Sequence, residues 1–265
     1  MTTSFARLGK RAALAAMVAA SAFALPSAGA AAGAKPTVVL VHGAFADSSS
    51  WDGVIARLAQ DGYTVVAAAN PLRSVQGDGA YVAALVNSIA GPVVLVGHSY
   101  GGSVISAAAT GASNVKALVY VAAFAPEAGE TAVGLSGKFP GSTLGPALAP
   151  PVALADGGKD LYIQQDKFPA QFAADVPAAK ARLMAAGQRP ITDAALNEAS
   201  PAPAWKTIPS WFIYGTGDKN IPPAALDFMA KRASSKETIV IQGASHVVMT
   251  SHPAEVARLI ASAAK

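Results

Sequence analysis

Ser99 lies in the pattern Gly-x-Ser-x-Gly, which is typical of a serine placed on a sharp turn to act as a nucleophile. The run Val93–Val96 before it predicts a buried strand, and Gly102–Thr110 after it predicts a helix. Gly97 and Gly101 flank the turn, where larger side chains would collide with the adjoining strand and helix. We therefore expect the turn to lift the Ser99 hydroxyl above a sheet.

A serine hydroxyl needs a base to become a nucleophile at neutral pH. His246 ends the stretch Gly243–His246, which follows the last predicted strand, and we predict that it is this base. His42 and His98 are interpreted as buried, hydrogen-bonded histidines. His252 precedes a proline at a predicted helix start, where a surface or capping role is the ordinary one.

The base in turn requires an acid that holds its imidazole in the correct tautomer. Asp218 ends the loop Gly215–Asp218 after the penultimate predicted strand, which is the expected position for this acid. Asp227, on the next predicted helix, is interpreted as a solvated surface charge, and Asp175 and Asp193 are weaker candidates. The predicted catalytic residues are Ser99, Asp218 and His246.

The oxyanion that forms during acyl transfer needs two N–H groups aimed at it. The backbone of Tyr100, directly after the nucleophile, is predicted to supply one. The loop His42–Phe45 after the first predicted strand is expected to supply the other. Gly43 lets the backbone turn there, which leaves Ala44 as the better donor and Phe45 as the alternative. The competing interpretation is that this loop is only a tight turn.

Short apolar runs alternate with helical patterns along the chain, which predicts an α/β fold with a mostly parallel sheet covered on both faces. The predicted strands are Thr37–Val41, Thr64–Ala68, Val93–Val96, Ala117–Ala122, Ser210–Tyr214 and Thr238–Ile241. The predicted helices are Trp51–Gln60, Ala80–Ile89, Gly102–Thr110, Ala224–Arg232 and Pro253–Ala263. Asp78 precedes the second of these helices and is positioned to cap it.

Residues 127–207 interrupt the alternation with a stretch rich in Pro, Gly and Ala. Long insertions at the carboxyl edge of a parallel sheet usually cover the active site, so we predict a helical cap. Short helices are expected around Lys159–Gln165, Pro169–Ala173 and Ala178–Ala186. A disordered linker is the alternative, and the large apolar residues of the stretch disfavour it.

The first 30 residues have the parts of a secretory signal peptide. Basic residues between Arg7 and Arg11 precede the apolar run Ala12–Leu25, and Ala28–Ala30 offers a cleavage site. An uncleaved membrane anchor is the alternative interpretation, and the shortness of the apolar run disfavours it. We expect residues 31–265 to form one domain of an exported protein, periplasmic or secreted, which meets a membrane only through this transient segment.

Without the signal segment the chain holds 17 basic and 16 acidic residues, so its charge is nearly balanced. No basic stripe with interleaved aromatics is present, which argues against a nucleic-acid partner. The chain has no cysteine, which excludes thiol catalysis and zinc–thiolate sites. It also lacks His-Glu-x-x-His and a Gly-x-Gly-x-x-Gly after the first strand. The sequence therefore predicts neither a metal nor a cofactor.

With these residues in place, the chain resembles the α/β-hydrolase superfamily over nearly all of residues 31–265. Within it, the likeness is to the small esterases that include plant methylesterases and hydroxynitrile lyases. The blocks that carry it are Val39–Phe45 with Trp51, Val94–Gly102, Gly215–Lys219 with Ile221-Pro222, and Gly243–His246. The resemblance implies a six-stranded core without the first antiparallel hairpin, catalytic roles for Ser99, Asp218 and His246, and N–H donors at Ala44 and Tyr100.

The resemblance also bears on the reaction. The lyases of this branch place a lysine after the base histidine, where this chain has Val247, and use a threonine at the position of Gly43. Related dehalogenases and epoxide hydrolases carry an aspartate at the position of Ser99. These differences favour a cofactor-free serine carboxylesterase that cleaves small to medium, largely apolar esters through an acyl-enzyme. Lyase, amidase or perhydrolase chemistry on the same residues, or a ligand-binding protein with little turnover, are the alternatives.

Large apolar side chains near the predicted chemistry are candidates for the wall of a substrate pocket. These candidates are Phe45, Trp51, Phe124, Trp205 and Val247, together with the side chain of Tyr100. For each aromatic the competing interpretation is plain core packing, which Phe45 and Tyr100 fit least well because they flank the chemistry.

Overall fold

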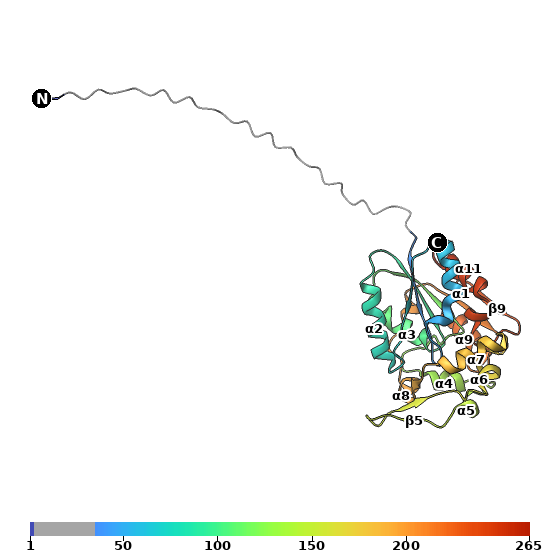
Figure 1. The fold of residues 1–265 in the computed structure, drawn as a ribbon. Helices are drawn as coiled ribbons and strands as arrows, with labels where there is room; N and C mark the ends of the chain where they lie inside the picture. Colours follow the sequence, from blue (N-terminus) through green and yellow to red (C-terminus); the bar gives the residue numbers. More distant parts are fainter. Residues whose placement is uncertain (3–34) are drawn as a thin grey trace. The chain divides into compact units, whose positions relative to one another are not determined.

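Six strands form one parallel sheet, as the sequence predicted, in a computed structural model that describes residues 1–2 and 35–265 (Figure 1). The strands are β1 (Thr37–Val41), β2 (Val65–Ala68), β3 (Val93–His98), β4 (Val115–Val121), β8 (Ser210–Gly215) and β9 (Thr238–Ile241). Their order across the sheet is β2-β1-β3-β4-β8-β9, and every neighbouring pair is parallel. The carboxyl ends of all six strands therefore meet at one edge of the sheet.

The burial of each strand follows its place in this order. All six residues of the central β3 are buried, whereas each residue of the edge strand β9 is partly or fully exposed. A central strand is covered by helices on both faces, so a continuous apolar run such as Val93–Val96 is what it requires. In register, Gly97 of β3 lies opposite Val41 of β1 and Tyr120 of β4, which brings the ends of these three strands together.

Helices cover both faces of the sheet. They are α1 (Asp52–Gln60), α2 (Val75–Asn87), α3 (Gly101–Ala108), α9 (Pro223–Arg232), α10 (Val248–Ser251) and α11 (Pro253–Ala263), with a 3-10 turn η1 (Ser48–Trp51) before α1. Figure 1 shows α2 packed beside α3 on one face, and α1 beside α11 on the other. Five of these helices correspond to the five that the sequence predicted.

The start of α2 differs from the prediction. The helix begins at Val75, and the Ser74 hydroxyl caps it by accepting the N–H of Gly77 at 2.8 Å. Asp78 lies inside the first turn and is buried, so it does not cap the helix from outside. Its carboxylate instead accepts the backbone N–H of Arg73 and the hydroxyl of Tyr100.

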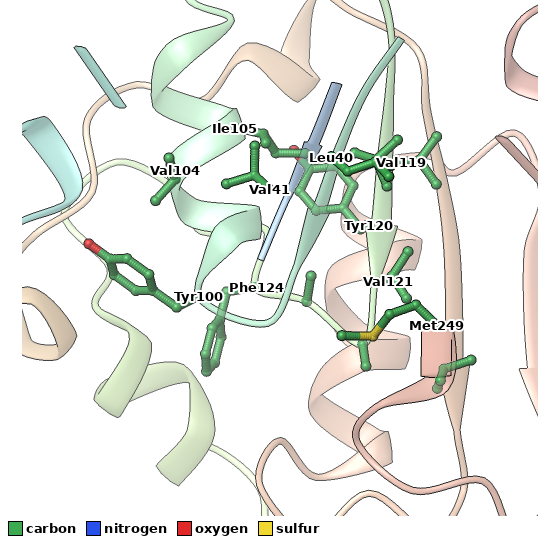
Figure 2. Close-up of a cluster of buried hydrophobic side chains, with 14 of the residues drawn as sticks. Leu40, Val41, Tyr100, Val104, Ile105, Val119, Tyr120, Val121, Phe124 and Met249 are labelled. Atoms are coloured by element: carbon green, nitrogen blue, oxygen red, sulfur yellow. The ribbon is translucent and has the colours of Figure 1, made fainter. Parts of the chain in front are cut away.

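The core lies between the sheet and these helices. Figure 2 shows part of it, where side chains of β1, β4 and α3 meet, such as Leu40, Val119 and Ile105. The rings of Tyr120 and Phe212 stack 4.6 Å apart at their centroids. A core built from branched aliphatic side chains on rigid strands gives the site a fixed frame.

The insertion between β4 and β8 gathers at one end of the sheet (Figure 1). Its elements are α4 (Ala132–Gly137), α5 (Leu144–Ala147), β5 (Val152–Ala153), β6 (Lys159–Leu161), α6 (Phe168–Phe172), α7 (Ala178–Gly187), β7 (Ile191–Thr192), α8 (Asp193–Asn197) and the 3-10 turn η2 (Ala204–Lys206). The helix predicted at Lys159–Gln165 is wrong, because β6 pairs antiparallel with β5 and β7 in a three-stranded sheet. The cap is therefore partly β rather than purely helical.

Two ion pairs connect the insertion to the domain formed by the six-stranded sheet and its helices. Arg73, before α2, contacts Asp160 of β6 at 2.5 Å. Arg232, at the end of α9, binds both carboxylate oxygens of Glu130 at 2.9 and 2.7 Å. The Arg232 guanidinium lowers the pKa of Glu130 below its ordinary value, which is the sign of a pair that favours the ionised acid.

The predicted signal peptide, with its apolar run Ala12–Leu25, lies outside the described residues. Among the residues that the structure does describe, no helix is both long and apolar enough to cross a bilayer.

Candidate active site

Ser99 occupies a strained turn between β3 and α3. Its φ is +54°, a left-handed conformation that a residue with a side chain adopts only where the surroundings enforce it. A Cβ at position 97 would stand 2.6 Å from the carbonyl oxygen of Gly101, and one at position 101 would stand 2.5 Å from that of Val41. Glycine is therefore needed on both sides of the nucleophile, as the sequence argument required.

The structure brings the three predicted catalytic side chains together. The Ser99 Oγ lies 2.8 Å from Nε2 of His246, and Nδ1 of His246 lies 2.6 Å from Oδ2 of Asp218. Because an ionised carboxylate only accepts, Nδ1 carries the proton in this pair, and Nε2 presents its lone pair to the hydroxyl. This arrangement can draw a proton from Ser99 as the oxygen attacks.

The carboxylate of Asp218 is itself held in place. Its Oδ1 accepts the backbone N–H groups of Asn220 at 2.8 Å and Ile221 at 3.0 Å, which leaves Oδ2 for His246. The side chains of both Asp218 and His246 are almost completely buried. A buried acid with both oxygens occupied keeps one orientation, so it fixes the imidazole that it binds.

His98 supports the base from the other side. It is fully buried, and its Nε2–H donates to the backbone carbonyl of His246 at 3.1 Å. Burial, and then the neighbouring His246, lowers the pKa of His98 well below its ordinary value, so its ring is neutral. The sequence interpretation of a buried, hydrogen-bonded histidine agrees with this placement.

The loop after β1 approaches Ser99 closely. A Cβ on Gly43 would stand 2.6 Å from Cβ of Ser99. The ring of His42 holds this loop, because Nε2 accepts the N–H of Asn70 at 3.1 Å and Nδ1 bonds the Gly43 carbonyl at 3.0 Å. Burial lowers the pKa of His42, so a neutral ring performs this role.

Two backbone N–H groups beside Ser99 are uncommitted. Among residues 35–265, the N–H groups of Ala44 and Tyr100 have no hydrogen-bond acceptor. Phe45, the alternative donor, gives its N–H to the carbonyl of Arg189 in the insertion at 3.0 Å. The geometry therefore favours Ala44 with Tyr100 as the pair that faces an oxyanion.

A cavity of about 320 Å³ opens beside Ser99, between the central domain and the insertion. Phe45, Tyr100 and Phe124 line it from the central domain. The insertion contributes mainly apolar side chains, among them Leu144, Leu148, Leu161, Phe172 and Leu196. Within the described residues, no Asp, Glu, Lys or Arg side chain lines the cavity. Such a wall suits an uncharged, apolar molecule.

Three residues predicted for the pocket wall do not line this cavity. Trp51 is fully buried, and its ring packs nearly perpendicular to that of His98, with the centroids 6.4 Å apart. Trp205 donates its Nε1–H to the carbonyl of Pro126 at 3.0 Å, and Val247 is buried at the start of α10. The competing interpretation of core packing holds for Trp51 and Trp205, and the prediction that Val247 lines the pocket is wrong, whereas Phe45 and Phe124 do reach the cavity.

The wall that the insertion supplies was not predicted from the sequence. Phe172 falls inside the helix expected at Pro169–Ala173, but neither it nor the leucines of the insertion were predicted to line a pocket. Leu144 and Leu148 stand four residues apart, a helical spacing that would have placed them on one face. That signal identifies a shared face but not what the face covers.

The fold and the site together indicate a family, and a comparison of sequences decides it. A family described as "Alpha/beta hydrolase family" matches residues 38–259. This chain belongs to the α/β-hydrolase family. The resemblance inferred from these sequence blocks is thereby confirmed.

Individual relatives fit this membership. Alpha/beta hydrolase nvfD of Aspergillus novofumigatus (strain IBT 16806) is 28% identical over an alignment of 250 residues, and the match covers 87% of this chain and 97% of that protein. The structure of polyneuridine aldehyde esterase matches with a TM-score of 0.76 at 18% identity, over 88% of this chain and 100% of that one. A pyrethroid hydrolase from Sphingobium faniae JZ-2 gives 0.68 at 22% identity, over 86% and 97%. The methylesterase MES16 from Arabidopsis gives 0.68 at 17%, over 86% and 98%. These solved structures share the fold with this α/β-hydrolase.

Proposed function

We propose that this α/β-hydrolase is a serine carboxylesterase that cleaves small to medium, largely apolar esters through an acyl-enzyme. One observation carries the proposal: the chain of contacts Ser99–His246–Asp218 opens on an uncharged cavity. The esterase names of two structural neighbours, polyneuridine aldehyde esterase and the Arabidopsis methylesterase, support the same reaction type.

In the proposed first step, Nε2 of His246 takes the hydroxyl proton of Ser99 while Oγ bonds to the ester carbonyl carbon. The electron pair of the carbonyl π bond moves to its oxygen, which faces the N–H groups of Ala44 and Tyr100. The C–O bond to the alcohol then breaks, and the imidazolium returns its proton to the departing alkoxide. Asp218 stays ionised and stabilises the imidazolium.

In the second step, a water molecule replaces the alcohol. His246 takes a proton from this water as its oxygen attacks the acyl carbon of the Ser99 ester. The same two N–H groups face the new oxyanion, and the proton then passes to Oγ as the carboxylic acid leaves. The balance of the cycle is ester plus water giving acid plus alcohol, so the proposed reaction needs no further reactant.

The cavity supports a neutral substrate of limited size. Its volume of about 320 Å³ is at the lower end of the range for small-molecule sites. A charged group on the substrate would lose its hydration against this wall without gaining an ionic partner. We therefore expect esters of uncharged acids and alcohols to react faster than analogues with a free carboxylate or ammonium group.

The test is hydrolysis of p-nitrophenyl esters from acetate to dodecanoate. The Ser99→Ala variant should lose roughly a thousandfold or more in kcat/KM, because it removes the nucleophile. Ser103→Ala is a matched control, since Ser103 is a buried serine of α3 whose Oγ forms no hydrogen bond with any described residue. Absence of hydrolysis at every length, from folded protein, would refute the proposal.

A fluorophosphonate probe separates the esterase from a low-turnover binding protein. Covalent labelling of Ser99 together with ester turnover is the expected result. Rapid labelling without turnover would favour the binding protein instead.

From the sequence of residues 1–30 we also propose export, and the N-terminal sequence of the protein isolated from its source would test cleavage after Ala30.

A further inference from the structure

A carboxylate of the insertion contacts the segment that carries His246. Asp175 lies between α6 and α7, and its Oδ1 accepts the hydroxyl of Ser245, the residue directly before His246. Ser245 is almost completely buried, and the side chain of Asp175 is 21% exposed. Asp218, and not Asp175, bonds the His246 ring, so the contact of Asp175 calls for a different role.

The same carboxylate faces a second residue of this segment. Oδ2 of Asp175 lies 3.4 Å from Nε2 of His252, which stands between α10 and α11. The two groups form an ion pair when His252 is protonated. Ser245 and His252 stand on either side of His246 in the chain, so one carboxylate meets the segment before and after the proposed base.

Few backbone contacts hold the start of this segment. Among the described residues, the N–H groups of Ser245, His246 and Val247 have no backbone hydrogen-bond acceptor. The carbonyl of His246 accepts the ring of His98. Because regular backbone hydrogen bonds do not define this stretch, contacts with side chains must fix its position.

The insertion also packs against the ring of His246. The Phe172 ring lies 5.1 Å from the His246 ring at their centroids, with 64° between the two planes. Phe172, Ala173 and Val176 are buried, so the chain is anchored on both sides of Asp175. A carboxylate on an anchored stretch of chain holds its partner in one place.

The loop that carries Asp218 meets the same part of the insertion. Nε2 of Gln171 donates to the carbonyl of Lys219 at 2.9 Å and to Oδ1 of Asn220 at 3.0 Å. Lys219 and Asn220 directly follow Asp218 in the chain. The stretch 171–175 therefore contacts the loop of the proposed acid and the segment of the proposed base.

We propose that Asp175 is a positioning residue through which the insertion sets the place of the proposed base. This inference rests on the proposed esterase function. By binding Ser245, the carboxylate holds the backbone that leads into His246. A displaced imidazole would lose its 2.8 Å contact with Oγ of Ser99, and proton transfer depends on that distance. Asp175 contacts Ser245 rather than a reacting atom, so its effect passes through His246.

The competing interpretation is that Asp175 only fastens the wall of the cavity, because Phe172 of the neighbouring α6 lines it. The two roles predict different kinetics. A displaced base lowers kcat for every ester, since both chemical steps use it. A displaced wall changes substrate binding, and therefore KM, most of all for a long acyl chain.

The test measures kcat and KM for p-nitrophenyl acetate, butanoate and octanoate. Asp175→Ala should lower kcat by roughly tenfold or more on each ester, with a change in KM of about threefold or less. Asp175→Asn keeps an oxygen that can accept from Ser245, so it should recover most of this loss. Asp166→Ala, at an exposed position just before α6, is the matched control and should equal the wild type.

A double-mutant cycle tests whether the effect passes through Ser245. Ser245→Ala removes the hydroxyl and should also lower kcat on every ester. The double variant should lose no more than Asp175→Ala alone, because the contact is already absent there. Urea unfolding shows which variants are folded. If Asp175→Ala does not fold, the loss of kcat in Ser245→Ala decides the test in its place.

The outcomes separate this inference from the function on which it rests. A wild-type kcat in folded Asp175→Ala would overturn the inference. A loss confined to KM or to the octanoate, an Asp175→Asn variant as slow as Asp175→Ala, or losses that add in the double variant would also overturn it. In these cases the wild type still hydrolyses esters, so the proposed function stands. Absence of hydrolysis by the wild type would overturn the proposed function and this inference with it.

Discussion

His98 and His246 are joined by a hydrogen bond from the ring of one to the backbone of the other. Nε2–H of His98 donates to the His246 carbonyl at 3.1 Å, and the two rings lie 4.8 Å apart at their centroids. His98, the residue just before Ser99, therefore holds the segment that carries His246. The distance of 2.8 Å between Ser99 and His246 depends on two loops, and this contact ties one to the other.

Replacing His98 should reveal a positioning role. His98→Leu removes the donor to His246 and should lower kcat by roughly 10- to 100-fold with a smaller change in KM, because a small displacement of the base is costly. His98→Gln offers an amide N–H near the same place and should recover much of that loss. Steady-state kinetics on a p-nitrophenyl ester measure both. Equal activity of the Leu and Gln variants would contradict the role.

The neutral state of buried His98 also predicts how stability depends on pH. Its pKa in the folded protein is lowered from the ordinary value of 6.5, mainly by burial. Below pH 6.5 the unfolded chain binds a proton there that the folded protein does not bind. The free energy of unfolding must therefore fall as pH decreases below 6.5, by up to about 1.4 kcal/mol per pH unit, until pH reaches the lowered pKa.

His98→Gln removes this proton uptake. In urea unfolding at pH 8, 6 and 5, the variant should lose less stability than the wild type between pH 6 and 5. His42, whose pKa burial also lowers, should continue to contribute in both proteins. Identical losses in the two proteins would mean that His98 is protonated in the folded state.

Asp218→Asn should leave the geometry of the site nearly intact while it disturbs the tautomer of His246. An amide nitrogen facing Nδ1 would donate to it, so the proton would move to Nε2 and the ring could no longer accept from Ser99. We expect kcat to fall by roughly 10³- to 10⁴-fold. Asp227→Asn is the control, because this acid lies on α9 and pairs with Lys231 at an exposed position, away from His246. A loss in both variants would point away from a specific role of Asp218.

Much of the fold could be predicted because the decisive signals are local. The strands β1 and β9 and the helix α11 have the predicted bounds, since apolar runs and a proline at a helix start depend on neighbouring residues alone. The proposed catalytic residues could be selected for the same reason: each follows a recognisable strand. Gly97 and Gly101 indicate the turn at Ser99 in the sequence, because both positions exclude a side chain.

The remaining features depend on contacts between distant residues. β6 forms a strand because Asp160 pairs with Thr192, and no local property of that stretch reveals the pairing. The sequence alone does not distinguish a pocket role from a core role for Trp205. The structure does, because the Trp205 Nε1–H donates to the Pro126 carbonyl. The residues around Asn220 do not predict how its side chain is oriented, because the contact that orients it comes from Gln171, 49 residues earlier.

Gly102 should tolerate no side chain, although it lies just inside α3. A Cβ there would stand 2.2 Å from the carbonyl oxygen of Phe124, so Gly102→Ala forces the backbone to move. We expect a loss of about 1–3 kcal/mol in the free energy of unfolding, measured with urea. Gly187→Ala is the matched control at the end of α7, where a Cβ meets no atom within 4 Å. It should be neutral or slightly stabilising, because alanine favours a helix.

Tyr100 has two separable roles, and one substitution distinguishes them. Its backbone N–H is a proposed oxyanion donor, whereas its hydroxyl donates to the buried Asp78 carboxylate at 3.0 Å. Tyr100→Phe keeps the first group and removes the second. Activity on a p-nitrophenyl ester should therefore stay within a few-fold of wild type, while stability at pH 8 should fall by about 1–3 kcal/mol. Tyr81→Phe, at an exposed position on α2, is the control and should change neither quantity.

The pH dependence of this deficit follows from the same contact. Burial raises the pKa of Asp78, and the hydrogen bonds from Arg73 and Tyr100 oppose that rise. Without the Tyr100 hydroxyl, the folded-state pKa of Asp78 must rise further above its ordinary value of 3.8. Above pH 3.8 the unfolded chain releases the Asp78 proton, whereas the folded variant keeps it to a higher pH than the folded wild type does. The stability deficit of the variant therefore grows as pH rises, and it shrinks as pH falls and Asp78 becomes protonated in both proteins. A stability difference between variant and wild type that stays constant from pH 8 to 4 would show that the Tyr100 hydroxyl does not act through the charge of Asp78.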